Sequence, residues 1–177
     1  PPWRPICMTC GVQFALTDSA IDICPICADE RQYVGCHGQQ WSTLERMRAA
    51  PRDSRTYSEE PGLDSLEIEQ ATAIGQRAFL RDRPQGTIIG DCTTYFDDQT
   101  LDLVRTRGPV FAMAISHLHF YAAMSSWAEA LDIPIYIHEA DREWVMDRRY
   151  VGFMYSVVNF IPMGPTAVKE IVRRLEL

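Results

Sequence analysis

Apolar and polar positions change their spacing several times along the chain, and each change predicts an element. The stretch 66–82 alternates apolar and polar residues in two pieces, which predicts two strands, and the apolar run 86–91, bounded by glycines, predicts a buried strand. Asp97 and Asp98 precede a segment that ends in arginines and Gly108, which is the pattern of a capped helix. The elements expected after it are a strand over 109–116, a helix over 122–132 and a strand over 133–139.

This alternation predicts an α/β fold, in which helices pack on a sheet and the loops that follow strands gather at its carboxyl edge. Residues 140–150 are expected to form a further helix, and residues 166–177 an amphipathic terminal helix. The apolar stretch 151–165 between them fits no single element.

The region before the sheet has a different character. Residues 39–64 carry charged residues, Pro and Ser without clear apolar periodicity, and we interpret them as a connector on the surface. Within it, 41–50 is a short helical candidate that Ser42 or Thr43 could cap. The predicted organisation is therefore a small module over 1–38, this connector over 39–64, and an α/β domain over 65–177.

Four of the six cysteines form two CxxC pairs, Cys7 with Cys10 and Cys24 with Cys27. Two such turns facing each other supply the four thiolates of a tetrahedral structural zinc site. Disulfides need an oxidising compartment, and a redox-active CxxC normally opens a helix in a thioredoxin-like unit. The sequence gives no sign of either, so the spacing predicts a zinc ribbon whose folding depends on its metal.

The other two cysteines are interpreted differently. Cys36 and His37 follow the ribbon closely and are alternative zinc ligands, although ordinary residues beside the ribbon are the preferred interpretation. Cys92 is interpreted as a buried apolar thiol.

Charge and hydropathy exclude several classes of function. Lys and Arg total 17 against 24 Asp and Glu, so the formal net charge is -7, which disfavours nonspecific binding to nucleic acids or anionic membranes. No apolar run approaches the roughly 18 residues of a membrane span, and the first residues lack the apolar core of a signal peptide. The expectation is a cytoplasmic protein in a reducing compartment, with no nucleic-acid or membrane partner.

His117 and His119 stand one residue apart where a buried strand is expected to end. In an extended segment both side chains point to the same side, so the pair can chelate one metal ion, and imidazole favours zinc or iron. A histidine pair at a strand end without a metal is the alternative.

Three segments around this pair resemble, in sequence and in order, the metallo-β-lactamase-fold hydrolases. They are GTIIGDC at 86–92, FAMAISHLHFY at 111–121 and IYIHEAD at 135–141. The resemblance covers about 66–146 and implies an α+β sandwich in which His117 and His119 are metal ligands and Asp91 matches the aspartate at an earlier strand end.

The sequence departs from this family at two places. Tyr121 and Ala122 replace the family's Asp-His, whose aspartate binds a second metal, and Tyr121 is a candidate donor to an oxyanion. The family's second half also supplies a third histidine, and the chain resembles the first half only. The candidates for further ligands are Asp91, His138, Asp141 or a partner chain, with a structural role preferred for His138.

Three functions are compatible with these residues. The first is a hydrolase in which a metal-bound water attacks the ester, thioester or lactam-type carbonyl of a small molecule. The second is a non-catalytic zinc-ribbon protein that binds a partner or acts as a scaffold. The third is an iron enzyme that uses two histidines and one carboxylate. A half-sandwich leaves apolar sheet surface uncovered, which favours a homodimer or a protein partner.

Overall fold

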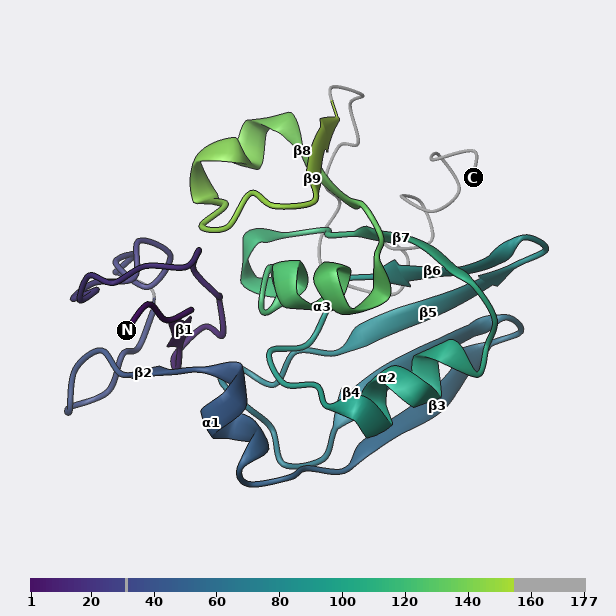
Figure 1. Ribbon diagram of the computed structural model, residues 1–177, viewed down its shortest axis with the longest axis horizontal. Helices are drawn as coiled ribbons and strands as arrows, with labels where there is room; N and C mark the ends of the chain where they lie inside the picture. Colours follow the sequence, from purple (N-terminus) through teal and green to yellow (C-terminus); the bar gives the residue numbers. More distant parts are fainter. Residues whose placement is uncertain (31, 155–177) are drawn as a thin grey trace.

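The computed structural model describes residues 1–30 and 32–154. Its main feature is a seven-stranded sheet in which the strands lie side by side in their order along the chain (Figure 1). The strands are β3 (Ser54–Glu60), β4 (Leu63–Ile68), β5 (Ala78–Arg83), β6 (Gly86–Gly90), β7 (Val110–Ala114), β8 (Ile135–His138) and β9 (Val151–Met154).

The sheet changes from antiparallel to parallel at β6. Strands β3 to β6 pair antiparallel, whereas β6, β7, β8 and β9 pair parallel. The parallel strands need crossover connections, which α2 (Asp98–Arg105) supplies between β6 and β7 and α3 (Met124–Leu131) between β7 and β8. Both helices lie over the same face of the sheet (Figure 1). The carboxyl ends of β6, β7 and β8 therefore meet at one edge.

The helices cover the apolar residues of that face. Alternation along each strand directs Leu80, Ile89 and Met113 toward the helices, and all three are buried in the main core cluster. Trp127 of α3 is buried against Phe96, with ring centroids 4.3 Å apart, and its indole nitrogen donates to the Thr93 carbonyl in the loop after β6. This core holds the carboxyl edge of the sheet in place.

The N-terminal module packs into the same core. It contains the short strands β1 (Ile6–Cys7) and β2 (Trp41–Ser42), which pair antiparallel, and is followed by α1 (Leu44–Arg48). Thr43 caps α1, because its side chain accepts a hydrogen bond from the Arg46 amide. Apolar residues of the module belong to the cluster that fills the space between sheet and helices, so the module is part of one continuous core.

Most predicted elements are confirmed. The fold is mixed α/β, the strands expected in 66–82, 86–91, 109–116 and 133–139 are present, and both crossover helices are found. Asp97 forms a capping box with Thr100 at the start of α2, as its position before the helix indicated.

Two predictions about secondary structure are wrong. The segment 39–64 is not an irregular connector, because it contains β3; the sequence missed this strand because β3 buries few residues and so lacks the periodicity that marks a strand. The short helix expected within 41–50 is confirmed as α1, with Thr43 as its cap. Residues 140–150 do not form an α-helix: a 3₁₀ helix spans Glu139–Trp144, and Asp147 turns inward to meet Arg149. The helix predicted over 166–177, like most of the ambiguous stretch 151–165, lies outside the described residues.

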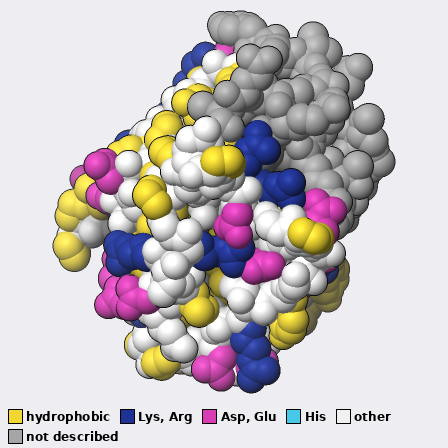
Figure 2. All heavy atoms as spheres, turned by 90° about the vertical axis from the view of Figure 1, so that its right-hand side faces the viewer, with side chains coloured by type: hydrophobic (Ala, Val, Ile, Leu, Met, Phe, Trp, Pro, Cys, Tyr) yellow, Lys and Arg dark blue, Asp and Glu magenta, His cyan; other side chains and the backbone are white. Residues whose placement is uncertain are grey.

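The surface at the hairpin end of the sheet carries interspersed charges of both signs (Figure 2). Arg107, which follows α2, pairs with Asp82 at 2.6 Å and with Asp64 at 2.5 Å, and Arg81 pairs with Glu60 at 3.2 Å. Among the described residues, no helix has the length and apolar content needed to cross a membrane.

Candidate functional site

The four cysteines of the CxxC pairs meet at one point. All four are buried, and their sulfurs lie within 4.8 Å of one another. The sulfurs of Cys7 and Cys27 are 3.6 Å apart and those of Cys10 and Cys24 are 3.7 Å apart. A disulfide holds its sulfurs at about 2.05 Å, whereas zinc with Zn–S bonds of about 2.3 Å separates tetrahedral sulfurs by about 3.8 Å. The four sulfurs are therefore not spaced as disulfides and could bind one metal ion between them.

Tight backbone turns aim these sulfurs inward. The Gly11 amide donates to the Cys7 carbonyl at 2.8 Å, and the Ala28 amide donates to the Cys24 carbonyl at 2.9 Å. Gly11 has a φ of +85°, a conformation that a glycine adopts without strain. The Gln39 side-chain amide donates to the Cys7 sulfur at 3.0 Å. This N–H lies outside the group of four cysteines and is placed to stabilise a thiolate at Cys7.

Crowding of the thiols perturbs their ionisation. Hydrogen bonds from Cys10 and Cys24 lower the pKa of Cys7, whereas hydrogen bonding with Cys24 raises the pKa of Cys10. One thiolate therefore forms readily and opposes ionisation of its neighbours. A metal cation at the centre would relieve this repulsion and keep all four sulfurs deprotonated.

Gln76 joins the first cysteine turn to the sheet edge. Its side-chain amide donates to the carbonyls of Cys10 at 2.6 Å and His119 at 3.0 Å, and its side-chain oxygen accepts from the Thr94 hydroxyl at 3.0 Å. Gln76 is 6% exposed, so these bonds are shielded from water. The cysteine module and the histidine loop are thus held by one buried side chain.

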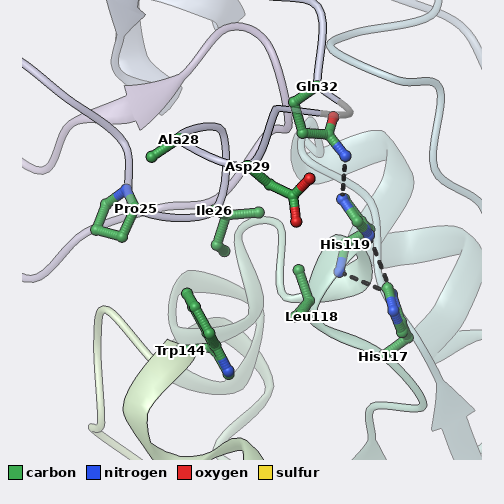
Figure 3. A pocket seen from close by; sticks show the side chains of 9 residues that line it. All are labelled: Pro25, Ile26, Ala28, Asp29, Gln32, His117, Leu118, His119 and Trp144. Atoms are coloured by element: carbon green, nitrogen blue, oxygen red, sulfur yellow. Dashed lines mark hydrogen bonds between the residues drawn. The ribbon is translucent and has the colours of Figure 1, made fainter.

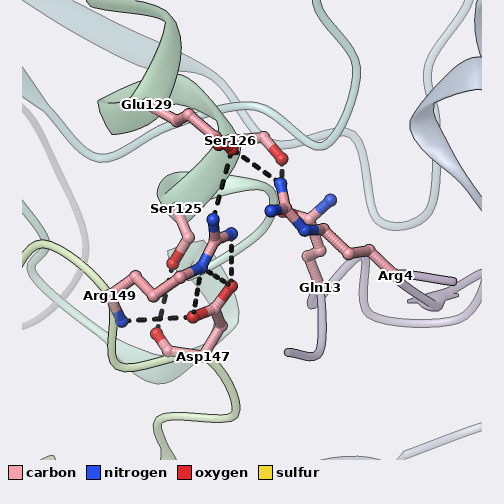
Figure 4. Close-up of polar contacts among 7 residues, drawn as sticks. All are labelled: Arg4, Gln13, Ser125, Ser126, Glu129, Asp147 and Arg149. Atoms are coloured by element: carbon pink, nitrogen blue, oxygen red, sulfur yellow. Dashed lines mark hydrogen bonds and ion pairs between the residues drawn. The ribbon is translucent and has the colours of Figure 1, made fainter. Parts of the chain in front are cut away.

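Ion pairs join the module to α3 on another side (Figure 4). Glu129 of α3 pairs with Arg4 at 2.6 Å and with Arg149 at 3.3 Å, and Arg149 also binds Asp147 at 2.7 Å. Asp147 is 2% exposed, and Arg149 provides its counter-charge. This network ties the N-terminus to the loop before β9.

His117 and His119 lie at the carboxyl end of β7 with their rings stacked. The ring centroids are 4.8 Å apart, and the two Nδ1 atoms are 3.1 Å apart. The His119 backbone amide donates to His117 Nδ1 at 3.2 Å, which starts the 3₁₀ helix Leu118–Phe120. Burial lowers the pKa of His117, which favours the neutral form that binds metals. The structure therefore brings the two predicted histidines together.

A cleft of roughly 610 Å³ opens beside this pair, between the second cysteine turn and the loops of the sheet edge (Figure 3). Trp144 and Leu118 line one side, and Pro25, Ile26 and Ala28 line the side formed by the module. Asp29 and Gln32 complete the lining, and the Gln32 amide nitrogen lies 2.7 Å from His119 Nε2. The cleft has apolar walls and a polar end at the histidines, which is the character of a small-molecule site.

Asp91 lies outside this cleft and supports its edge. Its carboxylate accepts hydrogen bonds from the Ser116 amide at 2.7 Å and the Ser116 hydroxyl at 2.9 Å, directly before His117. Burial raises the pKa of Asp91 to about 6, although the bonds from Ser116 lower it in part. Asp91 therefore fixes the end of β7 and does not reach the histidine rings.

The remaining candidates occupy separate positions. Tyr121 is completely buried, and its hydroxyl has no hydrogen-bond partner among the described residues. Burial and the nearby Asp141 carboxylate raise the pKa of Tyr121. His138 accepts a hydrogen bond from the Ala140 amide and so begins the 3₁₀ helix, which is a structural role. In the described part of the chain, the four cysteines form the one group of three or more potential ligands.

The sequence did not identify the residues that build the cleft around the histidines. Gln32 and Ile26 belong to the cysteine module, and Trp144 ends the 3₁₀ helix that follows β8. Nothing in their spacing signals a shared site, because they meet only through the packing of the module on the sheet edge. The continuation of the second CxxC turn into a polar segment is the one local sign.

Comparisons with known proteins give a relative in sequence and several similar solved structures. No known family model matches the chain. Among solved structures, a metallo-β-lactamase from Erythrobacter litoralis with β-mercaptoethanol in the active site has 18% identity and a TM-score of 0.47, over 66% of this chain and 56% of that one. The DIM-1 metallo-β-lactamase exposed to ceftazidime has 12% identity and a TM-score of 0.46, over 61% and 56%. The chain spans about half the length of these proteins.

The uncharacterized protein YmaE of Bacillus subtilis (strain 168) is 45% identical, over 97% of this chain and 84% of that protein. The matched stretch is 229 positions long, whereas the chain has 177 residues. YmaE therefore has residues within the match that have no counterpart here. With this identity over nearly its whole length, the chain belongs to the family of YmaE.

Proposed function

We propose that this protein is a metal-dependent hydrolase with a structural zinc at the four cysteines and a second metal ion at His117 and His119. Its substrate is a small molecule with an ester, thioester or lactam-type carbonyl. The observation that carries the proposal is the convergence of two imidazole nitrogens, 3.1 Å apart, at the polar end of an apolar cleft.

The cysteine cage fits zinc. Its sulfur separations of 3.6 and 3.7 Å agree with the edge of about 3.8 Å expected for tetrahedral Zn–S coordination. Soft thiolates in a buried set of four favour zinc over calcium or magnesium, which prefer oxygen ligands. The Gln39 amide supplies an outer hydrogen bond to the Cys7 sulfur, as is usual around such sites.

The histidine pair fits two positions of a metal site. For Zn–N bonds of about 2.0–2.1 Å, tetrahedral ligand atoms are about 3.3 Å apart, close to the observed 3.1 Å between the Nδ1 atoms. A metal at His117 Nδ1 would replace the hydrogen bond that this atom accepts from the His119 backbone amide. The described residues offer no third side chain at ligand distance. The remaining ligands in the proposal come from water, substrate, a partner chain or residues outside the described ranges.

The chain's own residues have distinct tasks in this proposal. When bound, a divalent metal at this point polarises a carbonyl and lowers the pKa of bound water. Trp144, Leu118 and Ile26 hold the apolar part of the substrate and exclude water from the reacting carbonyl. Asp91 fixes Ser116 and with it the start of the histidine loop, so the two rings are oriented before a substrate enters.

A second function is a non-catalytic zinc-ribbon protein that binds a partner. One observation favours it: among the described residues, the cysteines are the one set with enough ligands for a complete site. On this view the histidines only stabilise the loop, since His117 caps the 3₁₀ helix. A homodimer or another protein would then cover exposed parts of the sheet.

Metal content separates the two proposals. The protein is purified without added metal or chelator, and metals per chain are measured by elemental mass spectrometry. The hydrolase proposal predicts two equivalents in the native protein, one in the double variant His117→Ala/His119→Ala, and two in the control His37→Ala, whose side chain is exposed. Hydrolysis of a panel of ester, thioester and lactam substrates should disappear in the double variant alone.

The opposite result is equally clear. One zinc per chain in the native protein and in the double variant, with no hydrolysis by either, contradicts the hydrolase proposal and favours the non-catalytic one. The oligomeric mass of the same samples then tests the homodimer.

A further inference from the structure

A side chain of the cysteine module, and not of the sheet, contacts the outer nitrogen of His119. The Gln32 amide nitrogen lies 2.7 Å from His119 Nε2, and Gln32 follows the second CxxC turn by only a few residues (Figure 3). The opposite ring nitrogen, His119 Nδ1, faces His117. One ring nitrogen of His119 is therefore engaged by the module, and the other points to the proposed metal position.

We propose that Gln32 is a positioning residue, which fixes the ring orientation and tautomer of His119 so that Nδ1 faces the metal. This inference rests on the second metal of the proposed function. It assigns to the cysteine module a task beyond its own zinc, because the module supplies a group that supports the histidine site.

The chemistry of an amide suits both states of the ring. Without a metal, the Gln32 N–H donates to His119 Nε2, and the ring proton is then on Nδ1, where it points to the lone pair of His117 Nδ1. When Nδ1 binds a metal, the ring proton moves to Nε2 and donates to the Gln32 side-chain oxygen after a half-turn of the amide. A hydrogen bond that holds the outer nitrogen of a histidine ligand typically contributes 10–100-fold to metal affinity.

The position of Gln32 is fixed by the module on which it stands. The segment between the second CxxC turn and Gln32 lines the cleft with Ala28 and Asp29, and the backbone amide of Gln32 donates to the Asp29 backbone carbonyl at 2.9 Å. On the other side, Gln76 binds the carbonyls of both Cys10 and His119. The module and the histidine loop are thus held at two points, so His119 keeps its distance from Gln32.

Three substitutions test the proposal. Gln32→Glu keeps the length and offers only an acceptor, so it favours the proton on Nε2 and frees Nδ1 for a metal. Gln32→Met keeps the length and removes the hydrogen bond. Gln40→Ala is the control, because Gln40 is an exposed glutamine of the same module.

The first measurement is the tautomer of His119 by long-range ¹H–¹⁵N correlation NMR, on protein with zinc at the cysteines and no metal at the histidines. The native protein and Gln40→Ala should show the proton on Nδ1, Gln32→Glu should shift it to Nε2, and Gln32→Met should give a mixture. A His119 spectrum that is the same in all four proteins overturns the assignment of Gln32, whether or not the histidines bind a metal.

The second measurement is Co²⁺ affinity at the histidine pair, from the visible absorption of the same zinc-loaded proteins. Gln32→Met should weaken binding by roughly 10–100-fold, while Gln32→Glu should retain or strengthen it. Equal affinity in all variants contradicts the positioning role. Absence of Co²⁺ binding in every protein, together with the expected tautomer shifts, contradicts the proposed function but leaves the contact between Gln32 and His119 supported.

Discussion

The buried carboxylate of Asp91 should make the stability of this protein depend on pH in an unusual direction. Its folded-state pKa is about 6 because burial disfavours the charged form, whereas an unfolded aspartate titrates near about 3.9. The folded state therefore binds the proton more tightly. The contribution of Asp91 to the free energy of unfolding rises as the pH falls from 7.5 and is complete below about pH 4.

The magnitude follows from the two pKa values. Between pH 7.5 and pH 5, linkage gives a gain of about 1.4 kcal/mol from this single group. Other carboxylates change in the same range, so the contribution is isolated by comparison with Asp91→Asn. Asparagine does not titrate, tolerates the φ of +58° at this position, and can keep both contacts with Ser116, accepting from its amide and donating to its hydroxyl.

The assay is urea unfolding followed by circular dichroism at a series of pH values, on zinc-loaded protein. We expect the unfolding free energy of the native protein, minus that of Asp91→Asn, to increase by about 1.4 kcal/mol from pH 7.5 to pH 5. Asp98→Asn removes one negative charge at an exposed position and controls for the change in net charge. A difference that stays constant with pH, or that decreases toward pH 5, would refute the reasoning.

Three further outcomes are expected from other parts of the structure. Gly11→Ala should lower the free energy of unfolding, measured by chemical denaturation, by about 2 kcal/mol or more. The φ of Gly11 is +85°, and the added Cβ would collide with Thr94 and lie 2.9 Å from Gln76 Nε2. The control is Gly35→Ala, which has a similar φ but no atom within 4 Å of the added Cβ, and an equal loss there would remove the steric explanation. Arg149→Met should lower the free energy of unfolding by about 1–3 kcal/mol at pH 7, because it leaves the buried Asp147 without its counter-charge. A decrease below about 0.5 kcal/mol would instead indicate that water solvates the Asp147 carboxylate. Cys24→Ser should reduce the metal content by one equivalent. Because the module shares its core with the sheet, the substitution should also broaden the NMR signals of the cleft residues as well as those of the module. Changes confined to the module would contradict a shared core.

Much of the fold could be predicted from local pattern. Strands β6, β7 and β8 are short apolar runs, and α2 begins at an aspartate that forms a capping box, so periodicity and capping identified them. Strand β3 escaped prediction because it lies at the sheet edge with most side chains exposed. The segment 140–150 was misassigned because its polar spacing resembles a helix, whereas Asp147 pairs with Arg149, which is held in turn by Glu129 of α3, distant in the chain.

The candidate site divides in the same way. The sequence by itself identified the four cysteines and the histidine pair as candidates, because the CxxC and His-x-His spacings bring the side chains together within a few residues. Only the tertiary structure decided that the second cysteine turn forms a wall of the histidine cleft and that Gln32 reaches His119. These contacts join elements far apart in the chain, so they depend on how the module packs on the sheet edge. The buried hydrogen bonds of Gln76 and the shared apolar core hold the module in that position.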